Sequence, residues 1–402
     1  MDVMPILATL RRNKVGALLM ALQIALTLAV IANAGSVIRR HWTDMSRPSG
    51  LDEANVISMS NQWVGKPDDL RARIDADMAA LRSLPGVVDA EATNSFPLSG
   101  WSWVMGASLK PNQATPSAST SLYFDTTHGL AAQGLKLVAG RWFTPAEVAE
   151  LTPGDSKSTP SAVLTAALAK RLFPDGQALG RSVYVTGKDP ERVVGIVESG
   201  SSGSGSGMEY AEFSTFLSGQ MVSNQLLYVL RTQAGQQQPV MRAARQRLLE
   251  LSRMRILGEA TPFSTSRTRR FAVAAATSWL LTTVCSLMLV ITACGTVGLT
   301  MLWVAQRRRQ IGMRRALGAK RIDILRYFHT ENLLISGAGA LVGIAAGLGA
   351  NLWLVKHVAM ARMSPVHIVV GALIVLLLSQ LAVLWPALRA TKVPPSLAAR
   401  GL

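Results

Sequence analysis

The residues whose types and spacing suggest chemistry lie between Arg307 and Glu331, in the segment RRRQIGMRRALGAKRIDILRYFHTE. This segment is the most charge-dense part of the sequence, and its apolar residues recur at roughly helical spacing. It therefore predicts a short, basic, amphipathic helical element that is broken near Gly318. Cationic side chains in this arrangement attract anionic groups, and next to an apolar run they also orient a protein in a membrane.

A long apolar run flanks the basic segment on each side, so the positive-inside rule places the segment in the cytoplasm. Counting outward from it predicts four transmembrane helices, at 15–38, 271–305, 331–356 and 366–388. The cytoplasmic parts are then 1–14, 306–330 and 389–402, the periplasmic parts 39–270 and the short loop 357–365. At about 1.5 Å per residue, an uncharged run of this kind crosses a hydrocarbon core of roughly 30 Å.

Two of these spans allow alternatives. The first resembles a secretory signal with a cleavage site near Ala32-Asn33-Ala34, but its apolar run is longer than the usual signal core, which favours an uncleaved anchor. The second, at about 1.5 Å per residue, reaches roughly 50 Å and exceeds the bilayer. Either part of it projects into the periplasm, or the helix is tilted or broken near Gly295 to Gly298.

Composition restricts the class of protein. A hydrophobic content of 49 % indicates a membrane protein. The formal net charge is +17, but the basic residues gather beside apolar runs, which favours orientation and contact with anionic membrane lipids over nucleic-acid binding. On one helix, Cys285 and Cys294 lie about 13 Å apart, too far for a disulfide. The five histidines and two cysteines show no metal-binding spacing.

The large segment 39–270 contains no run of span length, so it is expected to be water-soluble. Strand patterns occur at 54–60, 86–95 and 225–231, and amphipathic helix patterns at 68–84 and 240–252. Two strand-helix units that bracket a middle region predict an α+β domain split by an insertion. We find no paired carboxylates, Ser-His-Asp order or phosphate-binding glycine loop that indicates catalysis there.

The basic segment and its surroundings resemble the MacB/FtsX-type (type VII) permeases of ABC transporters. The resemblance rests on RRxQIGxRRALGAKRxDILRxFxxEN before a glycine-rich apolar helix, and on LKLVAGRWFTPAE at 135–147, SAVLTAALAKRLF at 161–173 and ALGRSVYVTG with RVVGIVES up to 199. It implies four transmembrane helices, the second extended as a stalk, and a large α+β periplasmic domain. In that domain a porter-like part, about 50–95 and 222–255, is joined to a β-rich insertion, about 96–221.

The same resemblance assigns the basic segment to docking on an ATPase. The residues implied are Gln310, Ile311, Gly312, Arg314, Arg315, Ala316, Leu317, Gly318 and Ala319, with Gln310 standing where the family usually has Glu. In the third span, Gly339, Gly343 and Gly347 repeat every four residues and predict close helix packing, either against the fourth span or against another permease. Glu331 is expected to be an interfacial carboxylate near a helix amino terminus, where the helix dipole favours it.

No Walker A motif occurs in the sequence, so ATP and Mg²⁺ are expected on a partner and no catalytic, cofactor or metal residue is assigned here. The resemblance implies a MacB-like exporter subunit in the bacterial inner membrane, working with two copies of a separate ABC ATPase, a second permease that is identical or homologous, and a periplasmic adaptor. Its substrates would be periplasmic drugs, peptides or lipidic molecules. A non-transporting FtsX-like signal transmitter and a lipoprotein-extraction permease remain alternatives. The glycine- and serine-rich stretch 200–207 fits a natural loop and an engineered linker equally.

Overall fold

The computed structural model describes residues 14–65, 67–99, 102–154, 159–199, 212–358 and 363–391. It forms two compact units, one built from the chain up to Trp42 and from Ala274 onward, the other from Thr43 to Val273. Three predicted features lie wholly or mostly outside the described residues: the cytoplasmic segment 1–14 except Lys14, the stretch 200–207, and the tail 389–402 beyond residue 391. Each unit is described by itself below.

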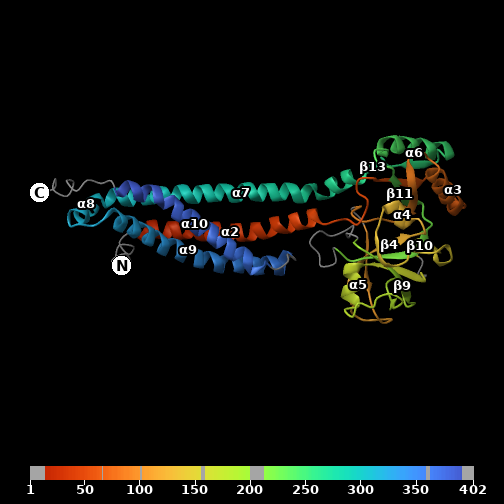
Figure 1. The fold of residues 1–402 in the computed structure, drawn as a ribbon, viewed down its shortest axis with the longest axis horizontal. Coiled ribbons are helices and arrows are strands. Elements are labelled where there is room, and N and C mark those ends of the chain that lie inside the picture. Colours follow the sequence, from red (N-terminus) through yellow and green to blue (C-terminus); the bar gives the residue numbers. More distant parts are fainter. Residues whose placement is uncertain are drawn as a thin grey trace. The chain divides into compact units, whose positions relative to one another are not determined.

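Four helices of the first unit are long and apolar enough to cross a membrane. They are α2 (Lys14–Ser46), α7 (Phe263–Gln306), α9 (Arg321–Val358) and α10 (Pro365–Ala390), and they run side by side in Figure 1. Helix α7 continues through Gly295 and Gly298, so the predicted alternative of a break there is wrong. Between α7 and α9 lies the short helix α8 (Arg308–Ala316).

Polar contacts join these helices to one another. Thr27 and Thr292 meet at 2.8 Å between α2 and α7, and Asn332 Nδ2 donates to Ser379 Oγ at 2.9 Å between α9 and α10. Asn33 Nδ2 donates to the Gly347 carbonyl at 3.2 Å between α2 and α9. Hydrocarbon offers polar groups no hydrogen bonds, so contacts of this kind set the register in which helices associate.

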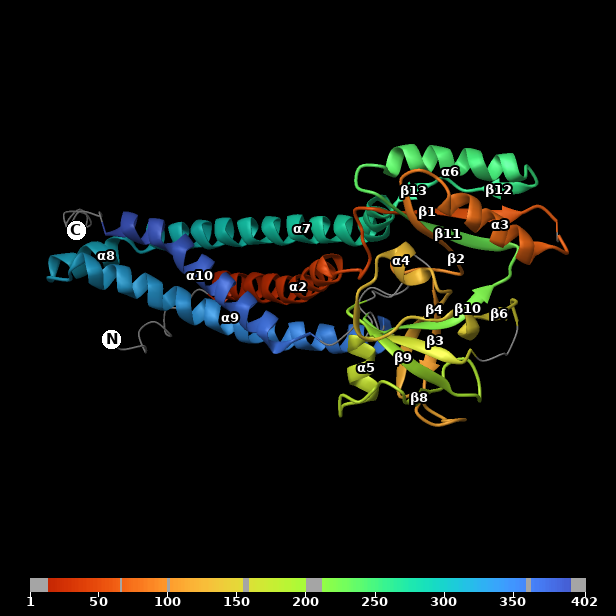
Figure 2. The same ribbon diagram turned by 45° about the vertical axis from the view of Figure 1, so that its right-hand side comes forward.

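The second unit contains a five-stranded antiparallel sheet in the order β12-β1-β11-β2, with β13 added to β1. Its elements are β1 (Val56–Trp63), α3 (Leu70–Arg82), β2 (Val87–Thr93), β11 (Gln225–Thr232), α6 (Gln237–Leu251), β12 (Arg255–Leu257) and β13 (Thr261–Pro262). Figure 2 shows α3 and α6 on one face of this sheet. This is the β-α-β-β-α-β arrangement of ferredoxin-like folds, interrupted between its second and third strands.

The interruption is a subdomain built on an eight-stranded mixed sheet in the order β3-β4-β10-β7-β9-β5, with β6 and β8 paired to its side. It comprises β3 (Trp103–Ala107), β4 (Ala118–Asp125), α4 (Gly129–Gln133), β5 (Leu137–Gly140), η1 (Pro145–Glu147), β6 (Ala149–Leu151), β7 (Ser161–Thr165), α5 (Ala166–Leu172), β8 (Ser182–Val183), β9 (Glu191–Val197) and β10 (Ser214–Met221). The predicted α+β domain with a β-rich insertion is confirmed.

Local residues account for the turns of this insertion. Trp142 and Phe143 pack with ring centroids 4.8 Å apart and are buried against the sheet. Gly140 precedes them with a φ of +75°, and a Cβ there would lie 2.3 Å from the Val194 carbonyl oxygen. Only glycine fits both the left-handed backbone and this close approach.

A buried ion pair ties the edge strand β12 to helix α3. Arg255 donates through Nη1 to Asp77 Oδ2 at 2.7 Å and through Nη2 to Oδ1 at 2.9 Å, and its guanidinium stacks 3.9 Å from the Trp63 ring centroid. Tyr228 donates its hydroxyl to the same carboxylate at 2.7 Å. Burial, with Asp77 next to it, raises the pKa of Tyr228, so the hydroxyl keeps the proton that it donates.

Candidate functional site

Helix α8 carries six of the nine predicted docking residues, and the turn after it carries Leu317, Gly318 and Ala319. The fold divides the nine between a buried and an exposed side. Ile311 and Gly312 are buried, and Ile311 packs with Ile324 and Phe328 of α9 and with Val383 and Ala387 of α10. The opposite face leaves the following docking residues exposed: Gln310, Arg314, Ala316, Leu317 and Gly318. Arg315 and Ala319 are half-buried.

Two large apolar side chains stand in solvent on this exposed face. Leu317 is 86 % exposed and Met313 is 49 % exposed, and basic residues flank both. Met313 was not among the predicted docking residues, although its spacing from Leu317, one helical turn, was visible in the sequence. An exposed apolar pair inside a basic rim is a feature of protein interaction surfaces.

A tight turn joins α8 to α9 at the predicted break. Gly318 has a φ of +97°, and the amide of Ala319 donates to the Arg314 carbonyl at 3.0 Å, as expected for a left-handed helix cap. On the other side, the Lys320 amide donates to Asp323 Oδ2 at 3.0 Å, which caps the start of α9. Arg314 stacks over Tyr327 of α9 at 4.9 Å from the ring centroid. These contacts hold α8 against α9 as a helical hairpin.

The predicted position of Glu331, near a helix amino terminus, is wrong. Helix α9 begins at Arg321, so Glu331 lies well inside it, where it is buried. Arg307, at the junction of α7 and α8, places Nη1 2.9 Å from Oε1 and 2.8 Å from Oε2 of Glu331. Both side chains are almost fully buried, so the pair connects the end of α7 to α9 in a low-dielectric environment.

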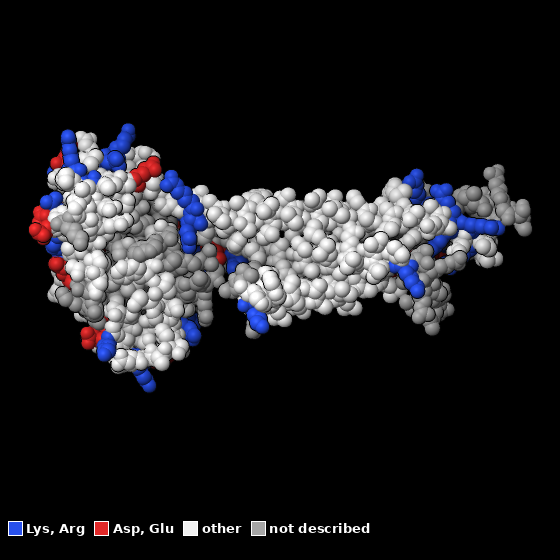
Figure 3. All heavy atoms as spheres, turned by 180° about the vertical axis from the view of Figure 1, so that it is seen from behind, with Lys and Arg blue, Asp and Glu red and all other residues white. Residues whose placement is uncertain are grey.

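Charge at this end of the helical unit is strongly positive. From Arg307 to Glu331 the sequence holds eight basic residues and only two acidic ones, Asp323 and Glu331, and these two are bound to the Lys320 amide and to Arg307. Figure 3 shows lysine and arginine side chains at this end and an almost uncharged lateral surface along the helices. The surface near α8 therefore attracts acidic partners.

The glycine repeat of α9 faces α2, neither of the two partners weighed from sequence. A Cβ added at Gly339 would lie 2.6 Å from the Ala21 carbonyl oxygen, and one at Gly343 would lie 2.8 Å from that of Ala25. Gly347 is less tight, with its nearest neighbour, the Ala29 Cα, at 3.4 Å. The small residues thus bring the third span against the first, with backbones in close contact.

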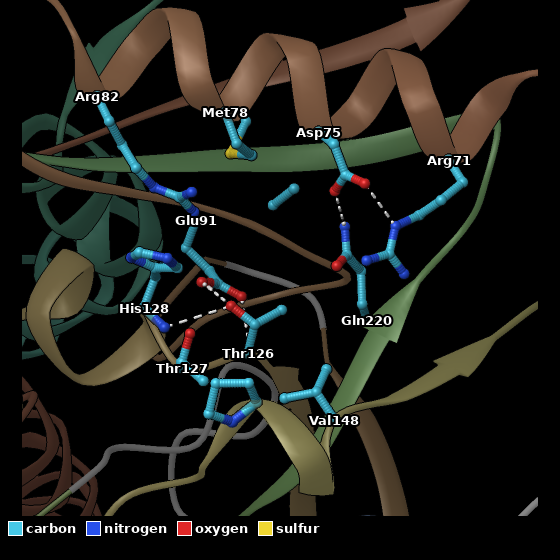
Figure 4. Close-up of a pocket in the computed structure, with 12 residues that line it drawn as sticks. Arg71, Asp75, Met78, Arg82, Glu91, Thr126, Thr127, His128, Val148 and Gln220 are labelled. Atoms are coloured by element: carbon cyan, nitrogen blue, oxygen red, sulfur yellow. Dashed lines mark hydrogen bonds and ion pairs between the residues drawn. The ribbon is translucent and has the colours of Figure 1, made fainter.

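A second candidate site is a cavity of about 380 Å³ in the second unit, at the junction of its two sheets (Figure 4). Helix α3 contributes Arg71, Asp75 and Arg82, β2 contributes Glu91, and the turn after β4 contributes His128. Asp75 accepts from Arg71 Nε at 2.8 Å and from Gln220 Nε2 at 3.3 Å. The lining is therefore partly polar and partly apolar, and several of its polar groups are paired with one another.

Two buried carboxyl groups that interact electrostatically, those of Glu91 and Asp125, lie at this cavity, and Glu91 is part of its lining. Glu91 of β2 accepts from the Thr126 amide at 2.8 Å and from its hydroxyl at 2.9 Å, and Asp125 ends β4 of the other sheet. Burial, reinforced by the nearby Asp125 charge, raises the pKa of Glu91 to about 8, and burial raises the pKa of Asp125 to about 7. The sequence did not reveal this pair because the two residues lie on separate strands of separate sheets.

The two sites present charged, hydroxyl and amide groups that can bind a partner or ligand. Among the residues that the structure describes, no cluster of three or more His, Cys, Asp or Glu side chains is arranged to hold a metal ion. Glu91 accepts hydrogen bonds from the amide and hydroxyl of Thr126, and Asp125 accepts one from the side-chain amide of Gln133 at 2.8 Å. The cavity therefore offers polar binding and proton exchange, and the α8 surface offers protein docking.

Most of the chain is similar in sequence to known proteins. Residues 18–247 match the family model described as the MacB-like periplasmic core domain, and residues 282–395 match the FtsX-like permease C-terminal model. The macrolide export ATP-binding/permease protein MacB 1/2 of Paracoccus denitrificans is 29 % identical over 69 % of this chain and 40 % of its own length. MacB of Chromobacterium violaceum is 29 % identical over 54 % of this chain and 33 % of its own length.

The chain thus spans less than half the length of these two relatives. Among solved structures, the periplasmic region of MacB from Actinobacillus actinomycetemcomitans is similar over 56 % of this chain and 97 % of its own, at 15 % identity and a TM-score of 0.33. The extracellular domain of the noncanonic ABC-type transporter YknZ gives a TM-score of 0.32 at 15 % identity, over 50 % of this chain and 98 % of its own. Both structural similarities are weak, and the family relationship rests on the sequence.

Proposed function

Since the chain belongs to the permease family that combines a MacB-like periplasmic core domain with an FtsX-like C-terminal domain, we propose that it transmits ATP-driven motion from an ABC ATPase to its periplasmic domain. Its four apolar helices and MacB-like domain make it a membrane protein with a periplasmic domain. The energy for this motion comes from the hydrolysis of ATP, which two copies of the partner ATPase bind together with Mg²⁺. The transported molecules are periplasmic drugs, peptides or lipidic compounds, and the membrane is the bacterial inner membrane.

The observation that carries this proposal is the surface of α8. Its exposed Met313 and Leu317 sit inside a basic rim, while Ile311 on the opposite face is fixed to α9 and α10. A partner with an apolar groove that is flanked by acidic residues is complementary to this surface in shape and in charge. The buried face of α8 packs against α9 and α10. A force applied at Leu317 therefore displaces α8 together with these two helices.

Two features support transmission of that push along the chain. Arg307 joins the end of α7 to α9 through Glu331, so displacement of α8 acts on both helices. Helix α7 is unbroken over 44 residues, which at about 1.5 Å per residue is roughly 66 Å of continuous helix. A continuous helix transmits displacement better than jointed segments, since each hydrogen-bonded turn is fixed to the next.

Two ATPase sites require two docking hairpins, so the permease works as a pair with an identical or a homologous permease. Large apolar side chains on α7, including Trp279, Leu280 and Leu287, are exposed in the single chain and offer surface for lipid or for that second permease. A periplasmic adaptor completes the exporter that we propose.

The test is an affinity pull-down of the intact, detergent-solubilised chain from its native membrane, followed by mass spectrometry. The unmodified chain is expected to recover an ATPase with a Walker A motif, and the double variant Met313→Asp, Leu317→Asp to recover at least tenfold less. The matched control is Leu251→Asp, Met254→Asp, a second exposed Leu-Met pair that lies in the periplasmic domain. It is expected to retain the ATPase.

Other co-purified proteins separate the alternatives. A periplasmic adaptor supports export, a wall hydrolase indicates an FtsX-like signal transmitter, and a different permease with a lipoprotein indicates lipoprotein extraction. Failure to recover any ATPase from an intact preparation would overturn the proposal. So would equal recovery by the Met313, Leu317 variant, because the α8 surface would then not be the docking site.

A further inference from the structure

A groove of about 790 Å³ opens at the same end of the helical unit as α8, between the start of α9 and the end of α10. Two arginines line it, Arg321 from the first turn of α9 and Arg389 from the last turn of α10. The rest of the lining is mostly apolar: Ile322, Leu325, Trp385, Leu388 and Thr391. The groove is therefore divided into a cationic part and a hydrophobic part.

Neither arginine is paired with a carboxylate in the part of the chain that the structure describes. Within the described part of the chain, no carboxylate forms an ion pair with Arg321 or Arg389. Asp323, the acidic residue of the α9 first turn, turns its Oδ2 to the Lys320 amide instead, at 3.0 Å. The described residues thus leave two positive charges of the groove uncompensated, which favours an anionic occupant.

The apolar side chains that line the groove are unusually exposed for their size. Trp385 is 55 % exposed, Ile322 47 % and Leu388 46 %, and the Arg389 guanidinium lies 5.4 Å from the Trp385 ring centroid. Tryptophan and arginine at the ends of transmembrane helices mark the level of the lipid headgroups. Exposed apolar side chains at that level are covered by acyl chains.

From this division of charge and apolar surface we infer that the groove between α9 and α10 binds an anionic glycerophospholipid. The phosphate lies between Arg321 and Arg389, and the first carbons of the acyl chains cover Leu388, Trp385 and Ile322. The groove volume falls in the range of roughly 300–1,000 Å³ that is typical of specific ligand sites. Basic pockets between transmembrane helices on the cytoplasmic side bind acidic lipids by this chemistry.

The position of the groove connects the lipid to α8. Leu325 lines the groove and also packs against the cluster that buries Ile311 of α8. A lipid bound there holds the first turns of α9 in the position that supports α8. The bound lipid therefore stabilises the docking hairpin, whichever protein docks on it.

The inference is tested by native mass spectrometry of the full chain in detergent, with phosphatidylglycerol or phosphatidylcholine added at equal concentration. We expect retention of phosphatidylglycerol at least tenfold above phosphatidylcholine. The variant Arg321→Gln, Arg389→Gln should reduce that preference at least fivefold. The control Lys14→Gln, Arg326→Gln removes two exposed charges from the same end of the helices, outside the groove, and should keep it.

Photocrosslinking gives an independent measurement on the unmodified protein. Phosphatidylglycerol with a photoreactive acyl chain is expected to crosslink to the peptides that contain Leu325 and Leu388. Soluble glycerophosphoglycerol and inorganic phosphate should fail to compete. Equal retention of the two lipids, an equal loss in the control, crosslinks elsewhere, or competition by free phosphate would each overturn the lipid assignment. None of these readings requires an ATPase, so they stand apart from the test of transport.

Discussion

Arg307 and Glu331 form a buried ion pair in which one guanidinium nitrogen, Nη1, lies within 2.9 Å of both carboxylate oxygens. The pair joins the end of α7 to the interior of α9, directly behind the exposed face of α8. The second terminal nitrogen of Arg307, Nη2, is buried and has no hydrogen-bond partner in the described structure. An ion pair whose groups are not all satisfied contributes little net stability but is costly to break.

Removal of one partner should therefore destabilise the helical unit. We expect Glu331→Gln to lower the free energy of unfolding by about 3–5 kcal/mol, because it leaves the Arg307 charge buried without a counter-charge. Replacing both groups, as Arg307→Met with Glu331→Leu, should restore most of the loss. Unfolding in detergent micelles measures both, and Arg326→Gln, which changes an exposed charge, serves as the control. A double variant no more stable than Glu331→Gln would contradict this account.

Charge on α8 should matter for coupling rather than for assembly. We expect the double change Arg314→Glu, Arg315→Glu to uncouple ATP hydrolysis from activity while membrane insertion and pairing of permeases persist, because the basic rim would then repel an acidic partner. Stimulation of ATPase activity by the reconstituted permease measures the coupling. The control Lys170→Glu, Arg171→Glu reverses two adjacent exposed charges on α5. Coupled activity that survives in the α8 variant would refute the docking role of this face.

Two glycines of α9 are predicted to respond in opposite ways, in stability, to replacement by alanine. Alanine normally stabilises a helix by about 1 kcal/mol over glycine. At Gly349 no atom lies within 4 Å of an added Cβ, so Gly349→Ala should be neutral or stabilising. At Gly343 the added Cβ would lie 2.8 Å from the Ala25 carbonyl oxygen, so Gly343→Ala should push α2 away and lower the melting temperature in detergent. Equal melting temperatures for the two variants would show that α2 and α9 are not in close contact.

The buried acids of the periplasmic domain predict a loss of local stability as pH rises. Folding raises the pKa of Glu91 to about 8 and that of Asp125 to about 7, so the folded state binds more protons than the unfolded state above about pH 4. Stability is then highest at low pH and falls until both groups are ionised, near pH 8. Arg82 is the positive group that partly opposes the ionisation penalty at Glu91.

Hydrogen exchange of β2 and β4 in the full chain, corrected for intrinsic exchange rates between pH 5 and pH 9, measures this effect locally. We expect protection to decrease with rising pH in the unmodified chain. In Asp125→Asn one carboxyl can no longer ionise, so the decrease should be clearly smaller. A decrease of equal size in Asp125→Asn would rule out the buried acids as its source.

Much of the architecture was visible in the sequence because it depends on local patterns. The four apolar runs, the break at Gly318 and the strand-helix units around the insertion each depend on residues close together in the chain. The helix bounds differ from those expected, since α2 and α9 extend beyond their apolar cores, to Ser46 and back to Arg321. Apolar content indicates where a helix crosses a membrane, but the helix itself continues as long as its backbone remains paired.

The sequence by itself determined the class of protein, the number of spans and the place of the basic segment between the second and third spans, since hydrophobic length and charge asymmetry act directly on the membrane. Tertiary structure alone decided what Glu331, Gly343 and Glu91 contact. Arg307 meets Glu331 across a helical hairpin, Gly343 meets a helix from the opposite end of the chain, and Glu91 meets a residue of another sheet. No local periodicity encodes such pairings, because they arise from the way in which distant segments pack together.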